Sequence, residues 1–257
     1  MASMMVLKII VSALTASFRV PHVMIGRLPT FKTPPPATLY GYLAGALGKW
    51  FNPNNLRFGY SFTYEGVAED LESAHIVEYS SGYLWKNGPI KNLEGQVNPQ
   101  RREFLFRPRM ELYLDGDREL LEKIKDAVLR PQFAALLGRS QDLATCHSAE
   151  WTDLENGREG FFANTILPWS MRTWTTRGIP VLMPKSVNYS YYREPLFERF
   201  LDIDEKPLFI YEGSPDIIGM EGFQTLNLDK SATRKKNGRT FSRAVILQPF
   251  EIEGVET

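Results

Sequence analysis

Three consecutive prolines, Pro34 to Pro36, fix the backbone within the segment "PTFKTPPPATLYGYLAGALGKW" (residues 29–50). A residue that precedes proline is disfavoured in the α-helical conformation, so Pro34 and Pro35 should be extended. Pro36 is the first residue of the run that can be helical, and proline is well suited to the first helical position. The segment therefore predicts a helix that begins at Pro36, with an apolar side formed by Leu39, Leu43, Leu47 and Trp50.

Glycines recur on another side of this expected helix, at Gly41, Gly45 and Gly48. Each glycine costs a helix about 1 kcal/mol relative to alanine. A stripe of glycines therefore predicts that another backbone approaches the helix closely, as in tight packing of a helix on a sheet.

The beginning of the same helix suggests a binding site. Free amides of residues 37–39 would point outward beside Lys32 and Thr33. Amides at a helix N-terminus attract anions, so this arrangement predicts a phosphate site.

Alternating apolar residues predict strands on both sides of the helix. The segment "VLKIIVSALTASFR" (residues 6–19) begins with Leu7, Ile9 and Val11 at every second position. The segment "LRFGYSFTYEG" (residues 56–66) alternates aromatic side chains, at Phe58, Tyr60, Phe62 and Tyr64.

A third alternation, in "RREFLFRPRMELYL" (residues 101–114), separates apolar from charged side chains. Its even positions from Phe104 to Leu114 are mostly apolar, whereas its odd positions are mostly charged. We interpret residues 75–112 as a protruding hairpin rooted in a sheet, with an arginine-rich face that includes Arg101, Arg107 and Arg109. A solvated strand face is the alternative.

A second helix is expected from Asp117, a good N-cap residue, to the stop at Arg130-Pro131. The segment "PQFAALLGRSQDLATC" that follows should expose Arg139, Ser140 and Gln141. The order strand, helix, strands, helix, strand predicts an α+β fold with a ferredoxin-like sheet related to RNA-recognition folds over residues 1–149. Residues 150–257 are expected to form a β-rich C-terminal region packed on that sheet.

Charge is balanced over the chain, with 30 basic and 30 acidic residues, but it is segregated along the sequence. Residues 1–64 contain six basic residues and no acid, whereas residues 196–228 contain seven acids and two basic residues. Near the C-terminus, Asn237-Gly238 is a hairpin-turn signal with a basic tip formed by Arg234, Lys235, Lys236 and Arg239. This tip is expected either to contact nucleic acid or to be a solvated loop.

Several classes of protein are disfavoured by what the sequence lacks. No apolar run reaches the ~18 residues that span a bilayer, and no hydrophobic leader begins the chain. A single cysteine, Cys146, allows no internal disulfide and fits a reducing cytoplasm. No metal is expected because Cys146-His147 has no partner cluster, and no cofactor is expected because phosphate-binding and dinucleotide-binding glycine motifs are absent.

Three of these segments together resemble one family. "PTFKTPPPATLYGYLAGALG", "QRREFLFRPRMELYL" and "PQFAALLGRSQDLATC" are similar, in order and spacing, to the CRISPR-associated Cas-five family, most of all to its type I-B branch. The resemblance is strong over residues 5–146 and weak beyond them. It implies a ferredoxin-like fold of the RAMP superfamily with a protruding thumb hairpin.

The resemblance also implies a role in the Cascade surveillance complex, in antiviral defence. There the subunit would cap the 5′ handle of the CRISPR RNA beside Cas-seven-type backbone subunits and a Cas-eight-type large subunit, and would meet target DNA only indirectly. The residues expected to bind RNA are Lys32, Thr33, Arg101, Arg102, Arg107, Arg109, Arg139, Ser140 and Gln141, with Arg234, Lys235, Lys236 and Arg239 as further nucleic-acid contacts.

One branch of the family cleaves precursor RNA without metal, using a tyrosine, a lysine and a histidine. Here Tyr40 or Tyr42 could supply the tyrosine and Lys86 or Lys91 the lysine. The histidines are His22, His75 and His147, each isolated, and no Lys-His pair stands on the charged strand. We therefore expect a non-catalytic RNA-binding subunit, with a metal-independent ribonuclease and a protein scaffold without RNA contact as the alternatives.

Overall fold

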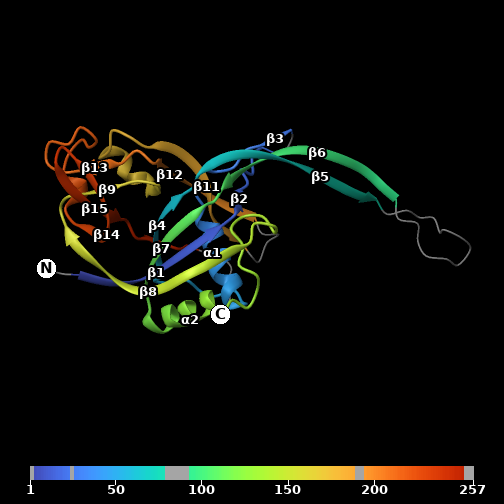
Figure 1. Cartoon of the computed structure of the whole chain (residues 1–257), viewed down its shortest axis with the longest axis horizontal. Coiled ribbons are helices and arrows are strands. Elements are labelled where there is room, and N and C mark those ends of the chain that lie inside the picture. Colours follow the sequence, from blue (N-terminus) through green and yellow to red (C-terminus); the bar gives the residue numbers. More distant parts are fainter. Residues whose placement is uncertain (1–2, 24–25, 79–92, 189–193, 252–257) are drawn as a thin grey trace, which may run out of the picture.

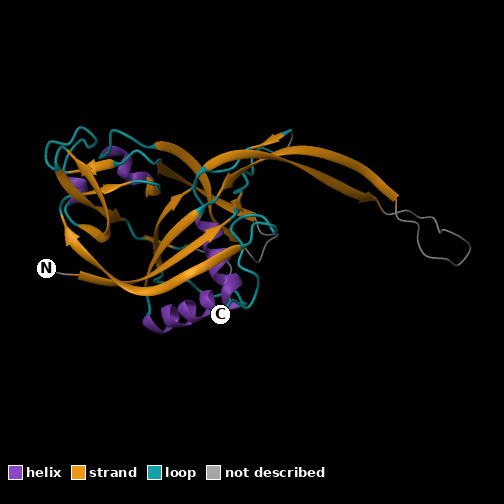
Figure 2. Ribbon diagram, viewed as in Figure 1, coloured by secondary structure: helices purple, strands orange, loops and turns teal. Residues whose placement is uncertain are grey.

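A nine-stranded sheet runs through the protein and carries both α-helices against one face. The computed structural model describes residues 3–23, 26–78, 93–188 and 194–251. Strands dominate these residues, and the helices are short (Figure 2).

The first part of the chain holds both α-helices. Its elements are β1 (Ser3–Ala13), β2 (Thr15–Ala16), β3 (Arg27–Leu28), α1 (Pro36–Leu47), β4 (Arg57–Thr63), β5 (Gly66–Glu78), β6 (Leu93–Phe106), β7 (Arg109–Asp115), α2 (Arg118–Leu129) and β8 (Ala144–Gly157).

The second part contains strands and short 3-10 helices, and no α-helix among its described residues. Its elements are β9 (Gly160–Phe162), β10 (Thr165–Pro168), η1 (Trp169–Thr173), β11 (Ile179–Asn188), β12 (Glu194–Ile203), β13 (Leu208–Ile210), η2 (Glu221–Phe223), β14 (Leu226–Lys236), β15 (Arg239–Val245) and β16 (Gln248–Pro249).

Four strands and two helices form the centre of the molecule. Strands β8, β1, β7 and β4 are adjacent in that order, and each neighbouring pair is antiparallel. The expected alternation in β1 is confirmed, because Leu7, Ile9 and Val11 are fully buried. They pack with α1 and with Leu121 and Ile124 of α2. Helix α2 begins as expected, since Asp117 accepts a hydrogen bond from the Leu120 amide at 3.0 Å.

The protruding hairpin is formed by β5 and β6, which extend far from the rest of the protein (Figure 1). The expected bounds of 75–112 are wrong: the hairpin begins at Gly66, and its second strand ends at Phe106. Arg107 has a left-handed backbone, φ 47°, and Pro108 follows it, so the chain turns before it enters β7. Because of this turn, the alternation of buried and exposed side chains expected across the whole segment does not continue through it. In β6 the odd-numbered Leu105 is buried, whereas the even-numbered Phe106 is exposed. Lys86 and Lys91 lie outside the described residues.

The sheet continues into the C-terminal part of the chain. Strand β8 pairs with β1 along its length and with β14 at its end, and β15, β9 and β13 follow across the sheet. Position 149/150, the expected boundary between the two regions, lies inside β8. At the opposite edge β16 pairs with β4, so the end of the described chain returns to the first part. Strands β10, β12 and β11 form a separate sheet.

A buried polar cluster joins the two parts across the face of the sheet. Asp229 of β14 accepts hydrogen bonds from Lys8 at 2.7 Å and from the Tyr113 hydroxyl at 2.6 Å. Glu111 contacts Lys8 at 2.9 Å and Arg243 at 2.8 Å. Burial opposes ionisation of Asp229, but the bonds from Lys8, Ser231 and Tyr113 outweigh it and hold its pKa well below the usual value.

The structure supports the packing explanation for the glycines of α1 only in part. A Cβ atom at Gly41 or Gly45 would meet no atom within 4 Å, so space does not require glycine at either position. The Phe133 amide does approach Gly45, and donates to its carbonyl at 3.3 Å. Of the three positions, only Gly48 has a backbone conformation that favours glycine. It ends the helix with φ 75°, and its amide donates to the carbonyls of Ala44 and Gly45. The predicted helix start is confirmed: Pro35 is extended with ψ 148°, and Pro36 is the first helical residue.

These positions predict opposite effects of the same substitution. Gly41→Ala should raise the free energy of unfolding by up to about 1 kcal/mol, because alanine favours a helix and its methyl group has space. Gly48→Ala should lower it by about 1 kcal/mol or more, because a left-handed backbone disfavours a side chain. Urea unfolding of both variants measures the difference. Destabilisation by Gly41→Ala would show that a close contact exists there after all.

Candidate nucleic-acid interface

One side of the root of the β5–β6 hairpin is held by Glu72. Its carboxylate contacts Arg102 Nε at 2.5 Å and Arg139 Nη1 at 2.6 Å, and it accepts from Gln141 Nε2 at 3.1 Å. Burial opposes ionisation of Glu72, but hydrogen bonds from Arg102 and Arg139 outweigh it, so its pKa lies below the usual value. The side chains of Arg102 and Arg139 are only 15% and 11% exposed.

Arg139 also has a second carboxylate partner. Asp142, whose side chain is fully buried, accepts from Arg139 Nε and Nη2, both at 3.0 Å. It further accepts from the Thr15 hydroxyl at 2.6 Å and the Ser17 amide at 3.1 Å. Contacts within the protein therefore hold Arg139 and Gln141 of the turn that the sequence predicts to face RNA, whereas Ser140 is exposed.

Glu103 holds the other side of the root. Its carboxylate contacts Arg27 at 3.0 Å and Lys32 at 3.1 Å, and it lies 3.4 Å from the Thr30 amide. Lys32 thus neutralises a carboxylate of the hairpin, although its side chain remains 42% exposed.

Three of the predicted arginines keep their charge available to solvent. Arg101 and Arg109 are exposed and have no ion-pair partner among the residues that the structure describes. Arg107 is exposed and lies 3.5 Å from Glu65, which is also exposed. Arg107 and Arg109 line one hollow at the root of the hairpin, together with Ser12, Thr63, Tyr64, Glu65 and Thr145.

The expected set of free amides at the start of α1 is not observed. The Thr38 and Leu39 amides both donate to the Pro35 carbonyl, at 2.9 and 3.3 Å, because the first helical turn closes on itself. Ala37 and Thr38 line a groove with Arg19, Arg102 and Arg139. Lys32 and Thr33 line a different pocket, so the structure separates the residues that the sequence placed together.

The C-terminal hairpin forms as predicted, with Asn237 and Gly238 both at positive φ between β14 and β15. Two of its four basic side chains are paired: Lys236 contacts Asp216 at 3.1 Å, and Arg239 contacts Glu159. Arg234 and Lys235 are exposed, without an ion-pair partner in the described part of the chain.

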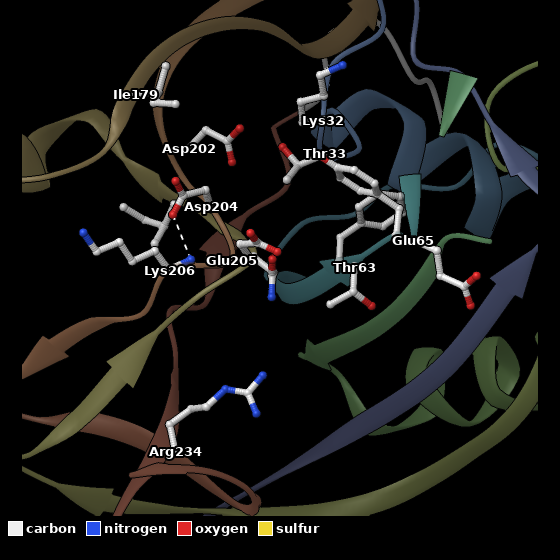
Figure 3. Close-up of a pocket in the computed structure, with 14 residues that line it drawn as sticks. Lys32, Thr33, Thr63, Glu65, Ile179, Asp202, Asp204, Glu205, Lys206 and Arg234 are labelled. Carbon is white, nitrogen blue, oxygen red and sulfur yellow. Dashed lines mark hydrogen bonds between the residues drawn. The ribbon is translucent and has the colours of Figure 1, made fainter. Parts of the chain in front are cut away.

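A pocket of about 800 Å³ lies between β4 and the end of β12 (Figure 3). Asp202 and Thr33 line it, and Figure 3 shows the two side chains facing the same space. Both residues are buried, and Asp202 Oδ1 and Thr33 Oγ1 have no hydrogen-bond partner within the described residues. Charged residues surround them: Lys32, Glu65, Asp204, Glu205, Lys206 and Arg234.

Asp202 is the residue of this pocket that the sequence interpretation missed. Burial, with a smaller contribution from Asp204, raises the pKa of Asp202 to about 6. A signal was present in "FLDID", where an acid interrupts the apolar run from Phe200 to Ile203. Whether a carboxylate in such a run is buried depends on which face of its strand is covered. The sequence does not show which face that is.

The residues considered for catalysis are dispersed. The Tyr40 hydroxyl donates to the Phe51 carbonyl at 2.7 Å, and the Tyr42 hydroxyl is buried without a partner in the described residues. His147 lies on β8, 2.6 Å from the Ser12 hydroxyl, whereas the ring of His22 contacts that of Phe197 in a tilted arrangement, with 4.8 Å between centroids. Burial raises the pKa of both tyrosines, which disfavours the tyrosinate form.

Neither a metal centre nor a membrane span is found in the described ranges. These residues contain no group of three or more His, Cys, Asp or Glu side chains that could hold a metal ion. No helix among them is long and apolar enough to cross a bilayer.

The buried carboxyl of Asp202 predicts a specific pH dependence of stability. Its pKa of about 6 in the folded protein exceeds the value of about 3.9 expected for an unfolded chain, so folding favours the protonated form. This contribution is complete below about pH 4 and is lost as the pH rises to 6. Asp202→Asn removes it, so the stability advantage of the variant should grow by up to about 3 kcal/mol across this window.

Thermal unfolding of both proteins at pH 4 and pH 7.5 tests this expectation. Asp204→Asn, on the exposed neighbour, is the matched control and should show a much smaller change with pH. A difference between wild type and Asp202→Asn that does not change with pH would contradict the expectation.

Comparison with known proteins places this arrangement in a family. The family model described as "CRISPR-associated protein (Cas_Cas5)" matches residues 6–199. A chain of a solved "CRISPR RNA-guided surveillance complex" is 14% identical with a TM-score of 0.50, over 77% of this chain and 90% of that chain. A "CRISPR protein from Archaeoglobus fulgidus" is 10% identical with a TM-score of 0.41, over 94% of this chain and 99% of that chain. No curated protein matches the chain.

The family match covers more than half of the chain. It contains the proline-led helix α1, the projecting β5–β6 hairpin and the turn at Arg139. The solved surveillance-complex chain shares the fold. The chain therefore belongs to the CRISPR-associated Cas-five family.

Proposed function

We propose that this chain is a non-catalytic RNA-binding subunit of a type I CRISPR Cascade complex, of the I-B kind. In this role it caps the 5′ handle of the CRISPR RNA and links Cas-seven-type backbone subunits to a Cas-eight-type large subunit. The observation that carries the proposal is the set of exposed arginines on the projecting hairpin and at its root: Arg101 on β6, and Arg107 and Arg109, which line one hollow. The fold shared with a chain of an RNA-guided surveillance complex supports it.

The strand order supports a ferredoxin-like RAMP architecture for the central part. The chain passes through β1, α1, β4, β7, α2 and β8, and the strands lie in the order β8-β1-β7-β4. This is the β-α-β-β-α-β arrangement, with both helices on one face. RNA-recognition folds use the opposite face or its edges to hold single strands.

The ion pairs decide which basic residues are available to RNA. Arg102, Arg139 and Lys32 each neutralise a carboxylate that anchors the hairpin. A phosphate would have to compete with Glu72, Asp142 or Glu103 for these side chains. Arg101 and Arg109 require no such exchange, so we assign the main phosphate contacts to them.

The positions of the tyrosines and histidines support a non-catalytic role. Cleavage at a ribose 2′-hydroxyl needs a base and a proton donor within hydrogen-bond reach of the same phosphodiester. Tyr40 and Tyr42 lie in the core beneath the sheet, whereas His147 is exposed beside Ser12. The ribonuclease alternative lacks a constellation of this kind within the described residues.

One prediction of this proposal concerns the exposed arginines. Arg101→Ala with Arg109→Ala should weaken binding of a repeat-derived handle RNA without changing the melting temperature. The dependence of log K on log salt should become shallower by about 1.4, from about 0.7 per lost phosphate contact. Fluorescence anisotropy at several salt concentrations measures both, and the RNA should remain full length without added metal.

Two further variants make that experiment specific. Lys49→Ala with Arg130→Ala removes two exposed charges at the ends of α1 and α2, and should leave RNA binding unchanged. Arg139→Ala should instead destabilise the fold by about 3 kcal/mol or more, because it leaves Asp142 buried without its charged partner. Equal RNA affinity for wild type and the Arg101/Arg109 variant would refute the assignment.

The second prediction concerns the C-terminal hairpin. If its free charges contact nucleic acid in the assembled complex, Arg234→Ser with Lys235→Ser should weaken binding of target DNA and leave assembly intact. Lys236→Ser with Arg239→Ser breaks the pairs with Asp216 and Glu159 and should lower the melting temperature. Wild-type DNA affinity in the Arg234/Lys235 variant at physiological salt would identify the tip as solvated surface.

A further inference from the structure

Two exposed arginines share one tryptophan on the surface of the C-terminal part of the chain. The guanidinium of Arg172 lies 5.0 Å from the centre of the Trp169 ring, and that of Arg199 lies 5.9 Å from it. Both arginines are exposed, and neither has an ion-pair partner in the part of the chain that the structure describes. Their charges are therefore not compensated by the described residues.

Trp169 fixes the positions of these arginines. It packs against the C-terminal core, so its ring is anchored in the protein. Arg172 also donates from Nη1 to the Trp169 carbonyl, at 3.3 Å. A cation over a tryptophan ring is attracted by the electron density of the ring face. The arginines are thus held in place before any partner binds, which reduces the side-chain entropy lost on binding.

Apolar side chains extend the same face of the sheet. Phe197 and Arg199 lie on one face of β12, because alternate residues of a strand share a face. The register of β11 with β12 sets Pro184 opposite Phe197 and Leu182 opposite Arg199. Leu182 is 43% exposed. Six residues thus form an arginine–tryptophan patch: Trp169, Arg172, Leu182, Pro184, Phe197 and Arg199.

The nearby acids of β12 lie on the other face of the strand. Glu198 pairs with Lys185 at 2.6 Å, and Asp202 lines the pocket beside β4. No acid stands among the residues of β11 and β12 that share the face of Arg199. The patch therefore combines positive charge with exposed apolar surface.

The edge of this sheet is unsuited to an added strand. Strand β11 is an edge of the sheet β10-β12-β11, and it contains Pro180 and Pro184. Proline has no amide to donate to a neighbouring strand, and prolines on an edge discourage strand addition. A partner would therefore contact this sheet through the side chains of the patch.

The composition of the patch favours a protein partner over a nucleic acid. The Trp169 ring already contacts the core and both guanidiniums, so it offers no open face on which a base could stack. Phosphates alone would leave Leu182 uncovered. Arginine and tryptophan are enriched among the residues that dominate protein–protein binding, and the centre of such interfaces is apolar. The natural partner of a guanidinium in a protein is a carboxylate, which it binds through two parallel hydrogen bonds.

We propose that the arginine–tryptophan patch docks an acidic segment of a partner protein. Two carboxylates of the partner pair with Arg172 and Arg199, and an apolar side chain beside them covers Leu182. This surface is separate from the arginines assigned to RNA, since none of its residues lines the hollow of Arg107 and Arg109. The inference therefore goes beyond the RNA-binding function proposed above and does not depend on it.

Site-specific photo-crosslinking tests the proposal in the full-length chain. Benzoylphenylalanine replaces Leu182 in the tagged protein, which is irradiated in the cells that naturally produce it and then purified. The expected crosslink is to a protein peptide that carries two or more Asp or Glu side chains next to an apolar one. The same photoreactive residue at Leu129, which is 48% exposed on α2 and lies outside the patch, should not crosslink to that peptide.

A synthetic peptide with the crosslinked sequence then measures the role of each arginine. Arg172→Ala and Arg199→Ala should each weaken its binding to the purified chain by about tenfold, as expected for a central charged contact. Arg199→Lys should retain only part of the affinity, because lysine keeps the charge but not the paired donors. Arg158→Ala removes an exposed arginine outside the patch and should leave the affinity unchanged. The melting temperature verifies that each variant is folded.

Three results would overturn the proposal. One is a crosslink from position 182 to nucleic acid or to a peptide without acidic side chains. Another is the absence of any crosslink from that position. The third is a peptide affinity that both alanine variants leave unchanged. RNA that copurifies with the tagged chain is measured in the same samples, so the proposed RNA-binding function succeeds or fails independently of this surface.

Discussion

The turn at Arg107 and Pro108 is the constraint on which the arrangement of the molecule depends. Before it, β6 belongs to a hairpin that extends away from the protein; after it, β7 lies in the centre of the main sheet. Backbone bonds fix the turn on both sides, from the Arg107 amide to Leu14 and from the Ala13 amide to Pro108. The left-handed backbone of Arg107 lets consecutive residues serve two different sheets.

The root of the hairpin shows how one residue type serves two purposes. Carboxylates on both sides of the root, Glu72 and Glu103, bind the basic side chains that reach them. Those pairs hold the hairpin against the body of the protein. The arginines beyond the reach of these carboxylates, Arg101, Arg107 and Arg109, are exposed to solvent. Position relative to two glutamates therefore separates the basic side chains that anchor the hairpin from the arginines whose charge faces solvent.

Buried aspartates show the same dependence on surroundings. Asp229 is surrounded by Lys8, Tyr113 and Ser231, which hold its pKa low and connect the N-terminal strand to the C-terminal hairpin. Asp202 is similarly buried but has no donor for Oδ1 within the described residues, and its pKa is raised to about 6. The first is a stable structural contact, whereas the second is a buried carboxyl whose ionisation the fold opposes.

The sequence by itself determined the elements whose causes are local. Proline geometry determined the start of α1, the Asp117 cap determined the start of α2, and Asn237-Gly238 determined the turn of the C-terminal hairpin. The order of these elements determined an α+β chain. Only the tertiary structure decided which charges are free, because Glu72, which pairs with Arg102 and Arg139, and Asp216, which pairs with Lys236, are distant from these side chains in sequence. It likewise decided that Thr33 and Asp202 share a pocket, since hydrogen bonding and burial depend on distances that a linear pattern does not contain.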